Sequence, residues 1–156
     1  MGKRKETTIK IRNKKAEFEY YLLSTYSAGI VLSGTEIKSI RAGKANLNDA
    51  YCSFENNELW VHNLHISPYS HGSYNNHEPK RDRKLLLNRK ELRKIMSKLN
   101  DVGITVIPTL LWINDNGYAK LNIAIAKGKK KYDKRQSIKE KDNRREAMRN
   151  SQDDSI

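Results

Sequence analysis

Residues 118–135 pass from a strict alternation of apolar side chains into a run of lysines, and this change constrains the fold more than any other stretch. Leu121, Ile123 and Ile125 alternate with polar or small residues, which is the period of a strand with one buried face. The next segment, AKGKKKYDKR (126–135), has almost no apolar side chains with which to extend a core. The sequence therefore predicts a folded body that ends near residue 128 and a basic C-terminal tail over residues 129–156.

The charge balance makes a polyanion the expected partner. The chain of 156 residues has 31 Lys and Arg against 18 Asp and Glu, a formal net charge of +13. Such an excess is typical of proteins that bind nucleic acid. Residues 1–12 are basic and have little to bury, so we expect a flexible N-terminal arm before a single folded domain over residues 13–128.

Cysteine and histidine usage predicts neither a disulfide nor a metal site. Cys52 is the only cysteine, which excludes an internal disulfide and agrees with a reducing compartment. His62 and His65 are three apart in an expected strand, so their side chains should leave opposite faces.

No apolar run approaches the ~18–20 residues that span a membrane, and the N-terminus lacks the apolar segment of a signal peptide. We expect a cytoplasmic protein with no cofactor, no metal and no membrane association.

Apolar and turn patterns predict a mainly β body. Strand patterns occur at residues 18–32, 51–54, 59–66, 104–113 and 118–126. Gly29 should mark a bulge or bend, the pair Asn56-Asn57 a tight hairpin turn, and Pro108 an edge or bulge. With two or three short helices, this order matches an oligonucleotide-binding-type closed antiparallel barrel.

Two capping boxes mark the starts of helices. Ser33 and Glu36 have the S-x-x-E spacing, and Gly43 is placed to end the first helix in the left-handed conformation. Asn88 and Glu91 have the same spacing at the start of the second helix. The apolar positions of that helix, which have the rhythm of one buried face, are Leu92, Ile95, Met96 and Leu99.

Cations and aromatic rings gather in and beside an expected loop over residues 67–83. Lys38 and Arg41 are three apart and share a face of the first helix. Stacking rings beside phosphate-seeking cations suit an RNA with exposed bases; here they are Tyr69, Tyr74 and His77, followed by Lys80, Arg81, Arg83 and Lys84. Three successive leucines, residues 85–87, cannot all point inward from an extended segment, so we expect Leu86 to be exposed for a partner.

The C-terminal tail combines ten cations after Gly128 with few apolar side chains. Tyr132 places a stacking ring inside the basic run, and alternating charges farther on suit a marginal helix. We expect a tail that is disordered when free and helical when an anionic surface neutralises it. The alternative is a tail that only keeps the protein soluble.

Four segments resemble the small protein B family of bacteria in wording, order and spacing. They are NKKAEFEYY (13–21), AGIVLSGTEIKSIRAGKANLNDAY (28–51), RKLLLNRKEL (83–92) and AIAKGKKKYDKR (124–135). The resemblance covers roughly residues 13–145. It implies an RNA-binding factor of trans-translation that is not an enzyme. Such a factor binds the tRNA-like domain of transfer-messenger RNA (tmRNA, or SsrA) and delivers it to the A site of stalled ribosomes. It senses the empty mRNA channel with its tail and reaches elongation factor Tu through the charged tmRNA.

The resemblance also implies roles for particular residues. Those that match the family's RNA-binding surface are Asn13, Tyr20, Glu36, Lys38, Arg41, Leu86 and Lys120. To these the charge pattern adds, as RNA-binding cations, Arg83, Lys84, Lys127, Lys129 and Lys130. The segment that matches the one engaging the ribosomal decoding centre is Tyr132, Asp133, Lys134 and Arg135, and the tail cations expected in the channel of the small-subunit rRNA are Lys139, Lys141, Arg144 and Arg145.

Two other functions share some of these features. A generic RNA-binding protein or ribosome-associated protein with an oligonucleotide-binding fold would have the same charge and strand plan, but it would bind single strands without preference. A nuclease would need clustered carboxylates to hold Mg²⁺. The candidates, Asp101, Asp115 and Glu36, have no motif that links them, so we expect no catalytic residue.

Overall fold

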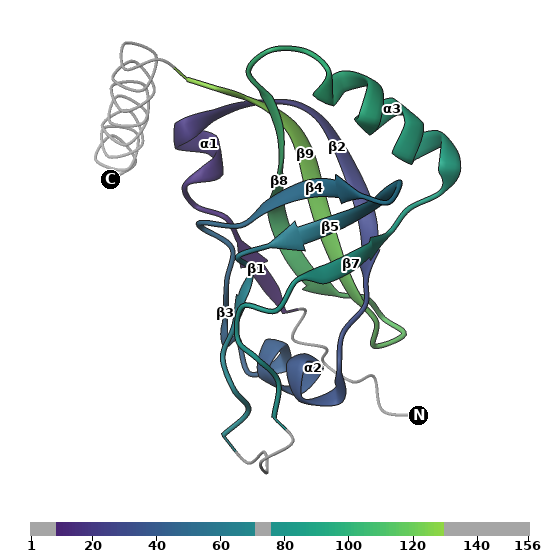
Figure 1. Ribbon diagram of the computed structural model, residues 1–156. Helices are drawn as coiled ribbons and strands as arrows, with labels where there is room; N and C mark the ends of the chain where they lie inside the picture. Colours follow the sequence, from purple (N-terminus) through teal and green to yellow (C-terminus); the bar gives the residue numbers. More distant parts are fainter. Residues whose placement is uncertain (1–8, 71–75, 130–156) are drawn as a thin grey trace, which may run out of the picture.

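The computed structural model describes residues 9–70 and 76–129, and this part of the chain is mainly β with three helices (Figure 1). In chain order the elements are β1 (Lys10–Arg12), α1 (Ala16–Glu19), β2 (Tyr20–Ile30), α2 (Gly34–Arg41), β3 (Ala45–Asn46), β4 (Tyr51–Glu55), β5 (Glu58–His62), β6 (His65–Ile66), β7 (Arg83–Leu86), α3 (Arg89–Leu99), β8 (Ile104–Ile113) and β9 (Ala119–Gly128). No helix of the described ranges is long and apolar enough to cross a membrane.

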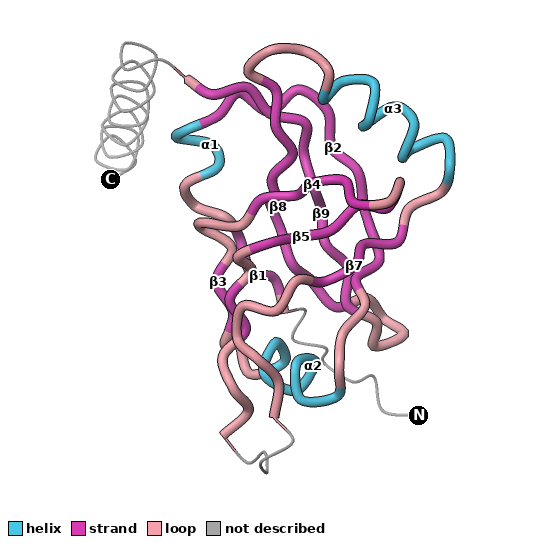
Figure 2. The backbone as a smooth tube through the Cα atoms, viewed as in Figure 1, coloured by secondary structure: helices cyan, strands magenta, loops and turns pink. Residues whose placement is uncertain are grey.

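Within residues 9–70 and 76–129, six strands are joined in a ring of antiparallel pairings (Figure 2). Their order is β8-β4-β5-β7-β2-β9, and β9 pairs back with β8. The join between β4 and β8 is the narrowest, a single pair of Cys52 with Val106. β1 pairs with residues 110–112 of β8, on the edge that β4 contacts at Val106, and β3 pairs with β6 in a separate small sheet. Every ring strand has two neighbours, but β2 pairs with β7 only at Gly29 and Ile30, so residues 20–28 of β2 have a ladder partner only in β9.

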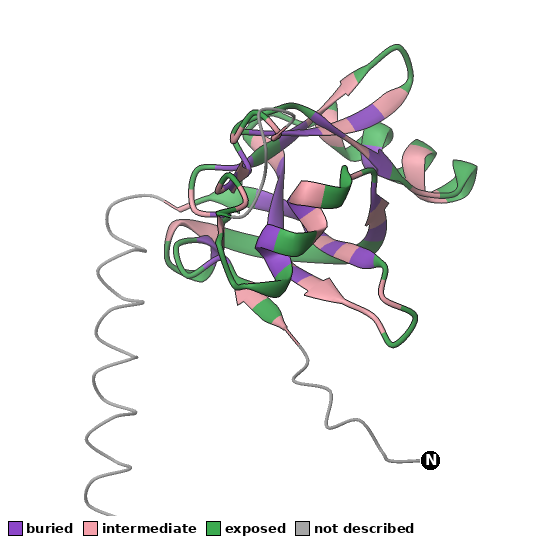
Figure 3. Cartoon of the chain, turned by 90° about the horizontal axis from the view of Figure 1, so that it is seen from below, coloured by how far each residue is buried: buried purple, intermediate pink, exposed green. Residues whose placement is uncertain are grey.

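The core lies where the inward faces of the ring strands meet. Leu121, Ile123 and Ile125 of β9 are all buried, as their alternation predicts. Fully burying a side chain of this size contributes about 1.5–3 kcal/mol. Figure 3, viewed from the α2 end, shows buried positions on the strands that surround α2 and exposed positions on the connecting loops.

Several local predictions are confirmed. Asn56 and Asn57 have φ values of 52° and 62°, which a two-residue hairpin turn between β4 and β5 requires. The pairing of β8 with β9 shifts register between Pro108 and Leu110, so the proline lies at a bulge. Both capping boxes form, and Gly43 follows α2 with a φ of 74°.

Other predictions about the strands are wrong. The long first strand is preceded by α1, and its bulge lies between Leu22 and Ser24 rather than at Gly29. The strand expected over 59–66 ends at His62, because Asn63 has a positive φ of 58° that turns the chain into β6. Arg83, predicted to lie in the loop, belongs instead to strand β7; the extended chain predicted for the leucines that follow agrees with this strand, but no strand was predicted there.

Two boundaries also differ from expectation. Lys10–Arg12 forms β1 against residues 110–112, so the predicted N-terminal arm is shorter than residues 1–12; residues 1–8 lie outside the described ranges. Within α3, Ile95 is buried but Met96 is 37% exposed. Met96 therefore lies at the margin of the face that the sequence predicts to be buried.

Gly29 is required by a close approach between strands. It pairs with Leu86 of β7 on one side and with Lys120 of β9 on the other. A Cβ atom at Gly29 would lie 3.2 Å from the Cβ of Leu86, which is tighter than ordinary van der Waals contact. The glycine therefore lets β7 and β2 approach each other under the exposed Leu86.

We predict that Gly29→Val destabilises the fold by about 1–3 kcal/mol, because its added carbons overpack against Leu86. Gly34→Ala is the matched control: a Cβ there meets nothing within 4 Å, so restricting the unfolded chain should stabilise by about 0.4–1 kcal/mol. Urea unfolding of the two variants measures both changes. Equal effects of the two substitutions would contradict the close approach.

Candidate nucleic-acid interface

α2 lies across one end of the strand ring and presents two exposed cations, Lys38 and Arg41 (Figure 1). The Nζ atom of Lys38 lies 5.5 Å from the centroid of the Tyr69 ring, within cation–π range. The Arg41 guanidinium reaches the turn between β8 and β9, 3.5 Å from where a Cβ on Gly117 would lie. Tyr118, next in that turn, is 68% exposed. We call Lys38, Arg41, Tyr69 and Tyr118 the α2 pole.

A buried carboxylate under α2 holds this pole together. Glu36 has no solvent exposure, and its Oε2 accepts a hydrogen bond from Nε of the equally buried Arg83. The other guanidinium nitrogens of Arg83 donate to backbone carbonyls, at 2.6 Å to Leu64, 3.4 Å to Glu78 and 3.2 Å to Pro79. One arginine therefore ties α2 to the segments on both sides of the long loop.

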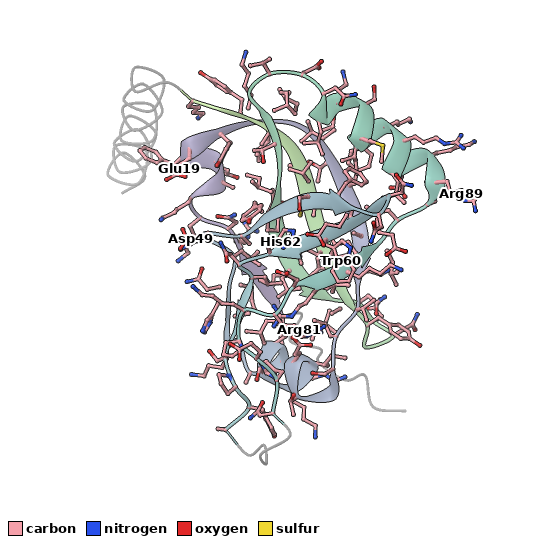
Figure 4. The ribbon with its side chains drawn as sticks, in the orientation of Figure 1. Glu19, Asp49, Trp60, His62, Arg81 and Arg89 are labelled. Carbon is pink, nitrogen blue, oxygen red and sulfur yellow. The ribbon has the colours of Figure 1, made fainter. Side chains whose placement is uncertain are left out.

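A second arginine completes the neutralisation. Nη2 of Arg81 donates to Oε1 of Glu36 at 2.6 Å and to the Val31 carbonyl at 3.4 Å. The same Oε1 accepts the Ser33 backbone N–H at 2.9 Å, as a capping box requires. Figure 4 labels Arg81 directly above α2. The Glu36 carboxylate thus has two roles: it caps α2, and it anchors the end of the long loop through Arg81.

Burial and hydrogen bonding oppose each other in setting the pKa of Glu36. Burial raises the pKa of this carboxyl, but hydrogen bonds from Arg81, Ser33 and Arg83 together outweigh it and hold the pKa below the ordinary value of 4.5. Burial lowers the pKa of Arg83, and its bond to Glu36 partly offsets this. Glu36 and Arg83 are therefore both charged at neutral pH. Either charge alone would be strongly destabilising in this buried site.

A row of outward-facing positions crosses the sheet beside the α2 pole. Residues directly opposite each other on antiparallel strands share a face, and the ladder pairs Leu86 with Gly29, Gly29 with Lys120, Lys120 with Trp112, and Trp112 with Lys10. Leu86 is 53% exposed, which confirms that it is the exposed leucine. We call these positions the cross-strand row; it offers two cations, an indole and an exposed leucine on one surface.

Other segments fix where the C-terminal tail leaves the body. Gly128 pairs with Tyr20 at the start of β2. The backbone N–H of Lys129 donates to the Glu19 carbonyl at 2.8 Å, and its Nζ donates to the Glu17 carbonyl at 3.0 Å. The same Nζ lies 4.9 Å from the centroid of the Tyr21 ring. The tail root, residues 127–129, is therefore anchored on α1 and β2 at the end of the ring away from α2.

Comparison with known proteins identifies the family. The family model for SmpB protein matches residues 10–153 of this chain. The chain belongs to the SmpB family. An SsrA-binding protein of Bacteroides thetaiotaomicron is 60% identical over 145 residues, which cover 93% of this chain and 97% of that protein. One of Streptomyces coelicolor is 49% identical over 149 residues, 96% of this chain and 93% of that protein.

A solved structure supports the same assignment. It is described as "tmRNA-SmpB: a journey to the center of the bacterial ribosome", and its matching chain is 45% identical with a TM-score of 0.69. The match covers 79% of this chain and 86% of that one. The resemblance that the sequence predicts is thereby confirmed, and with it the expectation of a protein that is not an enzyme, because SmpB is a family of RNA-binding proteins.

The structure distributes the sequence-predicted SmpB residues between surface and interior. Lys38, Arg41, Leu86 and Lys127 are exposed, whereas Tyr20, Lys84 and Lys120 are half-buried. Lys84 forms an ion pair with Glu58, with 2.8 Å between Nζ and Oε1. Glu36 and Arg83 are buried and mutually paired, so in this conformation they position the α2 pole and do not themselves face solvent. Lys130, Tyr132 and the tail residues after them lie outside the described ranges, as does Tyr74.

Asn13 is also interior, at a point where the SmpB fold needs a hydrogen-bond donor. It is 7% exposed, and its Nδ2 donates at 2.8 Å to the carbonyl of Pro108 and at 3.2 Å to that of Leu47. Its Oδ1 accepts the Ala16 N–H at 3.2 Å. Because the bulge at Pro108 interrupts the ladder, its carbonyl needs this partner. Asn13 therefore positions β1 and α1 against β8.

Three residues of the interface were not singled out from the sequence. Trp112, Lys10 and Tyr118 belong to it through strand pairing and the turn between β8 and β9. The alternation of β8 and β9 indicates which side faces outward, but their register decides that Trp112 lies opposite Lys120. A basic segment as short as Lys10–Arg12 carries no strand signal of its own.

A serine, a histidine and an aspartate lie in line on β4, β5 and the residue before β7. Ser53 Oγ is 2.6 Å from His62 Nε2, and His62 Nδ1 is 2.8 Å from Asp82 Oδ1; Figure 4 labels His62 at this place. The order resembles a nucleophile, base and acid. An acyl-transfer site also needs backbone donors that converge on an oxyanion, whereas Ser53 lies within a regular strand opposite Trp60. We interpret the cluster as a polar link between strands.

The carboxylates considered for a nuclease do not converge. Glu36 is buried within α2, Asp115 is exposed in the turn between β8 and β9, and Asp101 follows α3 near the opposite end of β8. Among the residues that the structure describes, no group of three or more His, Cys, Asp or Glu is placed to hold a metal ion. Burial raises the pKa of the Cys52 thiol, which disfavours a reactive thiolate.

We predict that Glu36→Gln destabilises the protein by about 3–5 kcal/mol, because it leaves the buried charge of Arg83 uncompensated. The matched control is Glu91→Gln. Glu91 occupies the same capping-box position in α3 but has no recorded ion pair among the described residues, so the change should cost about 1 kcal/mol or less. Chemical denaturation at neutral pH measures both.

The pH dependence of the difference follows from the lowered pKa of Glu36. Its contribution to stability is complete above the unfolded value of 4.5 and is lost as the pH falls through the lower folded-state pKa. The gap between wild type and Glu36→Gln should therefore narrow in acid. A gap that stayed constant down to the acid limit of folding would argue against a charged Glu36.

Proposed function

We propose that this protein is the RNA-binding factor of trans-translation: it binds the tRNA-like domain of tmRNA and brings it to the A site of stalled ribosomes. The α2 pole carries the proposal, because it gathers exposed Lys38 and Arg41 with two tyrosine rings at one end of the ring. Support comes from relatives called SsrA-binding proteins and from the likeness to the chain in the tmRNA–SmpB structure. Elongation factor Tu would be reached through the charged tmRNA.

The strand ring is, in this proposal, an oligonucleotide-binding-type closed antiparallel barrel. Supporting observations are the two neighbours of each ring strand and the return of β9 to β8. Such a scaffold gives the RNA a rigid surface, since strands that are paired on both sides move little relative to each other. The cross-strand row would then extend the α2 pole along the outside of the barrel.

The chemistry of the pole suits a folded RNA with a few unstacked bases. Lys38 and Arg41 meet phosphates as cations, while the exposed ring of Tyr118 offers a flat face to a base that is not paired. Lys120 and Lys10, two positions apart in the cross-strand row, extend the positive surface. The buried Glu36–Arg83 pair would act indirectly, by holding α2 at a fixed angle to the row.

The tail would make a second, separate contact. Its root is fixed on α1 and β2, away from the α2 pole, so RNA held at the pole leaves the tail exit uncovered. We infer that residues 130–156 enter the mRNA channel when it is vacant, because resident mRNA would compete for the same surfaces. The decoding-centre segment Tyr132–Arg135 would be the first to do so.

We predict that the triple variant Lys38→Gln, Arg41→Gln, Lys120→Gln weakens binding to the isolated tRNA-like domain by tenfold or more. If each lost cation meets a phosphate, the slope of log affinity against log salt should shrink by ~0.7–0.9 per contact. Fluorescence anisotropy with labelled RNA over a salt series gives both quantities, and the thermal midpoint reports folding.

A competitor separates this function from a generic RNA-binding protein. Excess unstructured single-stranded RNA should displace little of the tRNA-like domain from the wild-type protein. Equal competition by both RNAs would favour the generic alternative. Unchanged affinity and salt slope in the triple variant would remove the α2 pole from the interface.

We predict that truncation after Lys131 spares binding of the tRNA-like domain but abolishes tagging of proteins on stalled ribosomes, because the tail contributes only after RNA delivery. A reconstituted tagging assay and anisotropy on the same preparation measure the two activities. Loss of RNA binding after the cut would refute the division between body and tail.

A further inference from the structure

α3 carries a second concentration of positive charge that the proposed function does not use. Its sequence is RKELRKIMSKL, and five of its cations are exposed while its one acid, Glu91, is part of the capping box. We call the exposed cations the α3 cationic face; they are Arg89, Lys90, Arg93, Lys94 and Lys98. Figure 4 shows Arg89 at the outer edge of the molecule, on α3.

The placement of these charges costs stability. Three like-charged pairs are four positions apart, Arg89 with Arg93, Lys90 with Lys94, and Lys94 with Lys98, and each such pair destabilises a helix by about 0.2–0.5 kcal/mol. Arg89 and Lys90 also occupy the first turn, where the helix dipole disfavours cations. None of the ion pairs recorded for residues 9–70 and 76–129 includes these five cations. An external anion would relieve this repulsion.

The surface beside these charges is shaped for contact. A groove of about 590 Å³ runs between α3 and the β4–β5 turn, and Arg89, Arg93 and the partly exposed Met96 line it. Asn56, Asn57 and Glu58 form its other wall, and the carboxylate of Glu58 is paired with Lys84 at 2.8 Å. The cations of α3 therefore face two amides and a carboxylate whose charge is already paired within the protein.

α3 has no aromatic residue, and this favours one kind of nucleic-acid contact. Proteins that hold single strands stack bases on aromatic rings, whereas duplex RNA is bound through phosphates and shape. With 11 residues, α3 is about 16 Å long, enough to follow several phosphates along one backbone. The chemistry fits the sugar–phosphate edge of a duplex.

The α3 face and the α2 pole lie at opposite ends of the β8–β9 hairpin. Arg41 reaches the turn at Gly117, whereas α3 runs into Ile104 of β8, which pairs with Lys127 of β9. β8 has ten residues, so the two ends are about 30 Å apart. Figure 1 shows α3 and the tail root at one end of the strands and α2 at the other. The N-terminal end of α3 follows Leu86 of the cross-strand row by three residues, whereas its C-terminal end leads to Ile104, so the α3 cationic face extends from the row away from the pole.

We propose that the α3 cationic face docks on the phosphate backbone of a ribosomal RNA duplex. This inference rests on the proposed function, because it takes the α2 pole as the tmRNA side and the tail end as the ribosome side. Docking at α3 gives the body its own grip on the ribosome, independent of the tail. It would orient the tail root before the tail enters its channel.

The test uses the full chain with Lys90→Gln, Arg93→Gln and Lys94→Gln, which removes all three like-charged pairs. Because glutamine has a helix propensity close to those of lysine and arginine, the variant should be at least as stable as wild type. Affinity for vacant small ribosomal subunits and for protein-free small-subunit rRNA should fall about tenfold, with a shallower salt dependence. Affinity for the tRNA-like domain should not change. The matched control keeps the charges: Lys90→Arg, Arg93→Lys and Lys94→Arg should bind as wild type.

Each other outcome has a distinct meaning. Unchanged affinity for both ribosomal targets would overturn the proposal. Loss of binding to the tRNA-like domain would assign α3 to tmRNA, and loss with intact subunits but not with bare rRNA would point to an acidic ribosomal protein; either would overturn it. If wild type itself failed to bind the tRNA-like domain, the proposed function would fail whatever α3 does.

Discussion

A carboxylate without solvent exposure has to be neutralised, and Glu36 meets this requirement with two arginines from one distant segment. The other N–H groups of the Arg83 guanidinium donate hydrogen bonds to backbone carbonyls beside the long loop. The network joins the end of β2, α2, the loop and β7, so the angle of α2 depends on it. Lys38 and Arg41 can remain exposed on α2 because the buried charge beneath them is neutralised.

The strand ring holds α2 and the root of the tail apart, at opposite ends of the body. β8 and β9 run the length of the body, with the Arg41 contact at their turn and the tail root at their open end. Asn13 secures the one place where β8 loses its regular pairing, at Pro108. A rigid spacer between two basic ends suits the proposed function, in which the body holds one RNA at the α2 pole while the tail approaches another.

Much of the site was predictable in kind, and less of it in geometry. The capping boxes, the exposed Leu86 and the cations of α2 follow from spacing of a few residues, because they depend on local hydrogen bonds and on the period of helices and strands. Arg83 looked like a free phosphate-binding cation beside Lys84, yet it is buried. No sequence pattern within a few residues of Arg83 predicts that it pairs with Glu36, which is 47 positions away. Trp112 and Lys10 escaped notice for a related reason, since strand register brings them into one row.

By itself the sequence determined the family, the β-rich body, the helix starts and the hairpin turns, because each is written in residues close together along the chain. Tertiary structure alone decided that Glu36 and Arg83 are interior, that Gly29 separates Leu86 from Lys120, and that α2 and the C-terminal end of α3 lie at opposite ends of the β8–β9 hairpin. These outcomes depend on pairing between distant segments and on the desolvation of charge. Both are properties of the packed chain, because the identity of a charged residue does not indicate whether water or an opposite charge will surround its side chain.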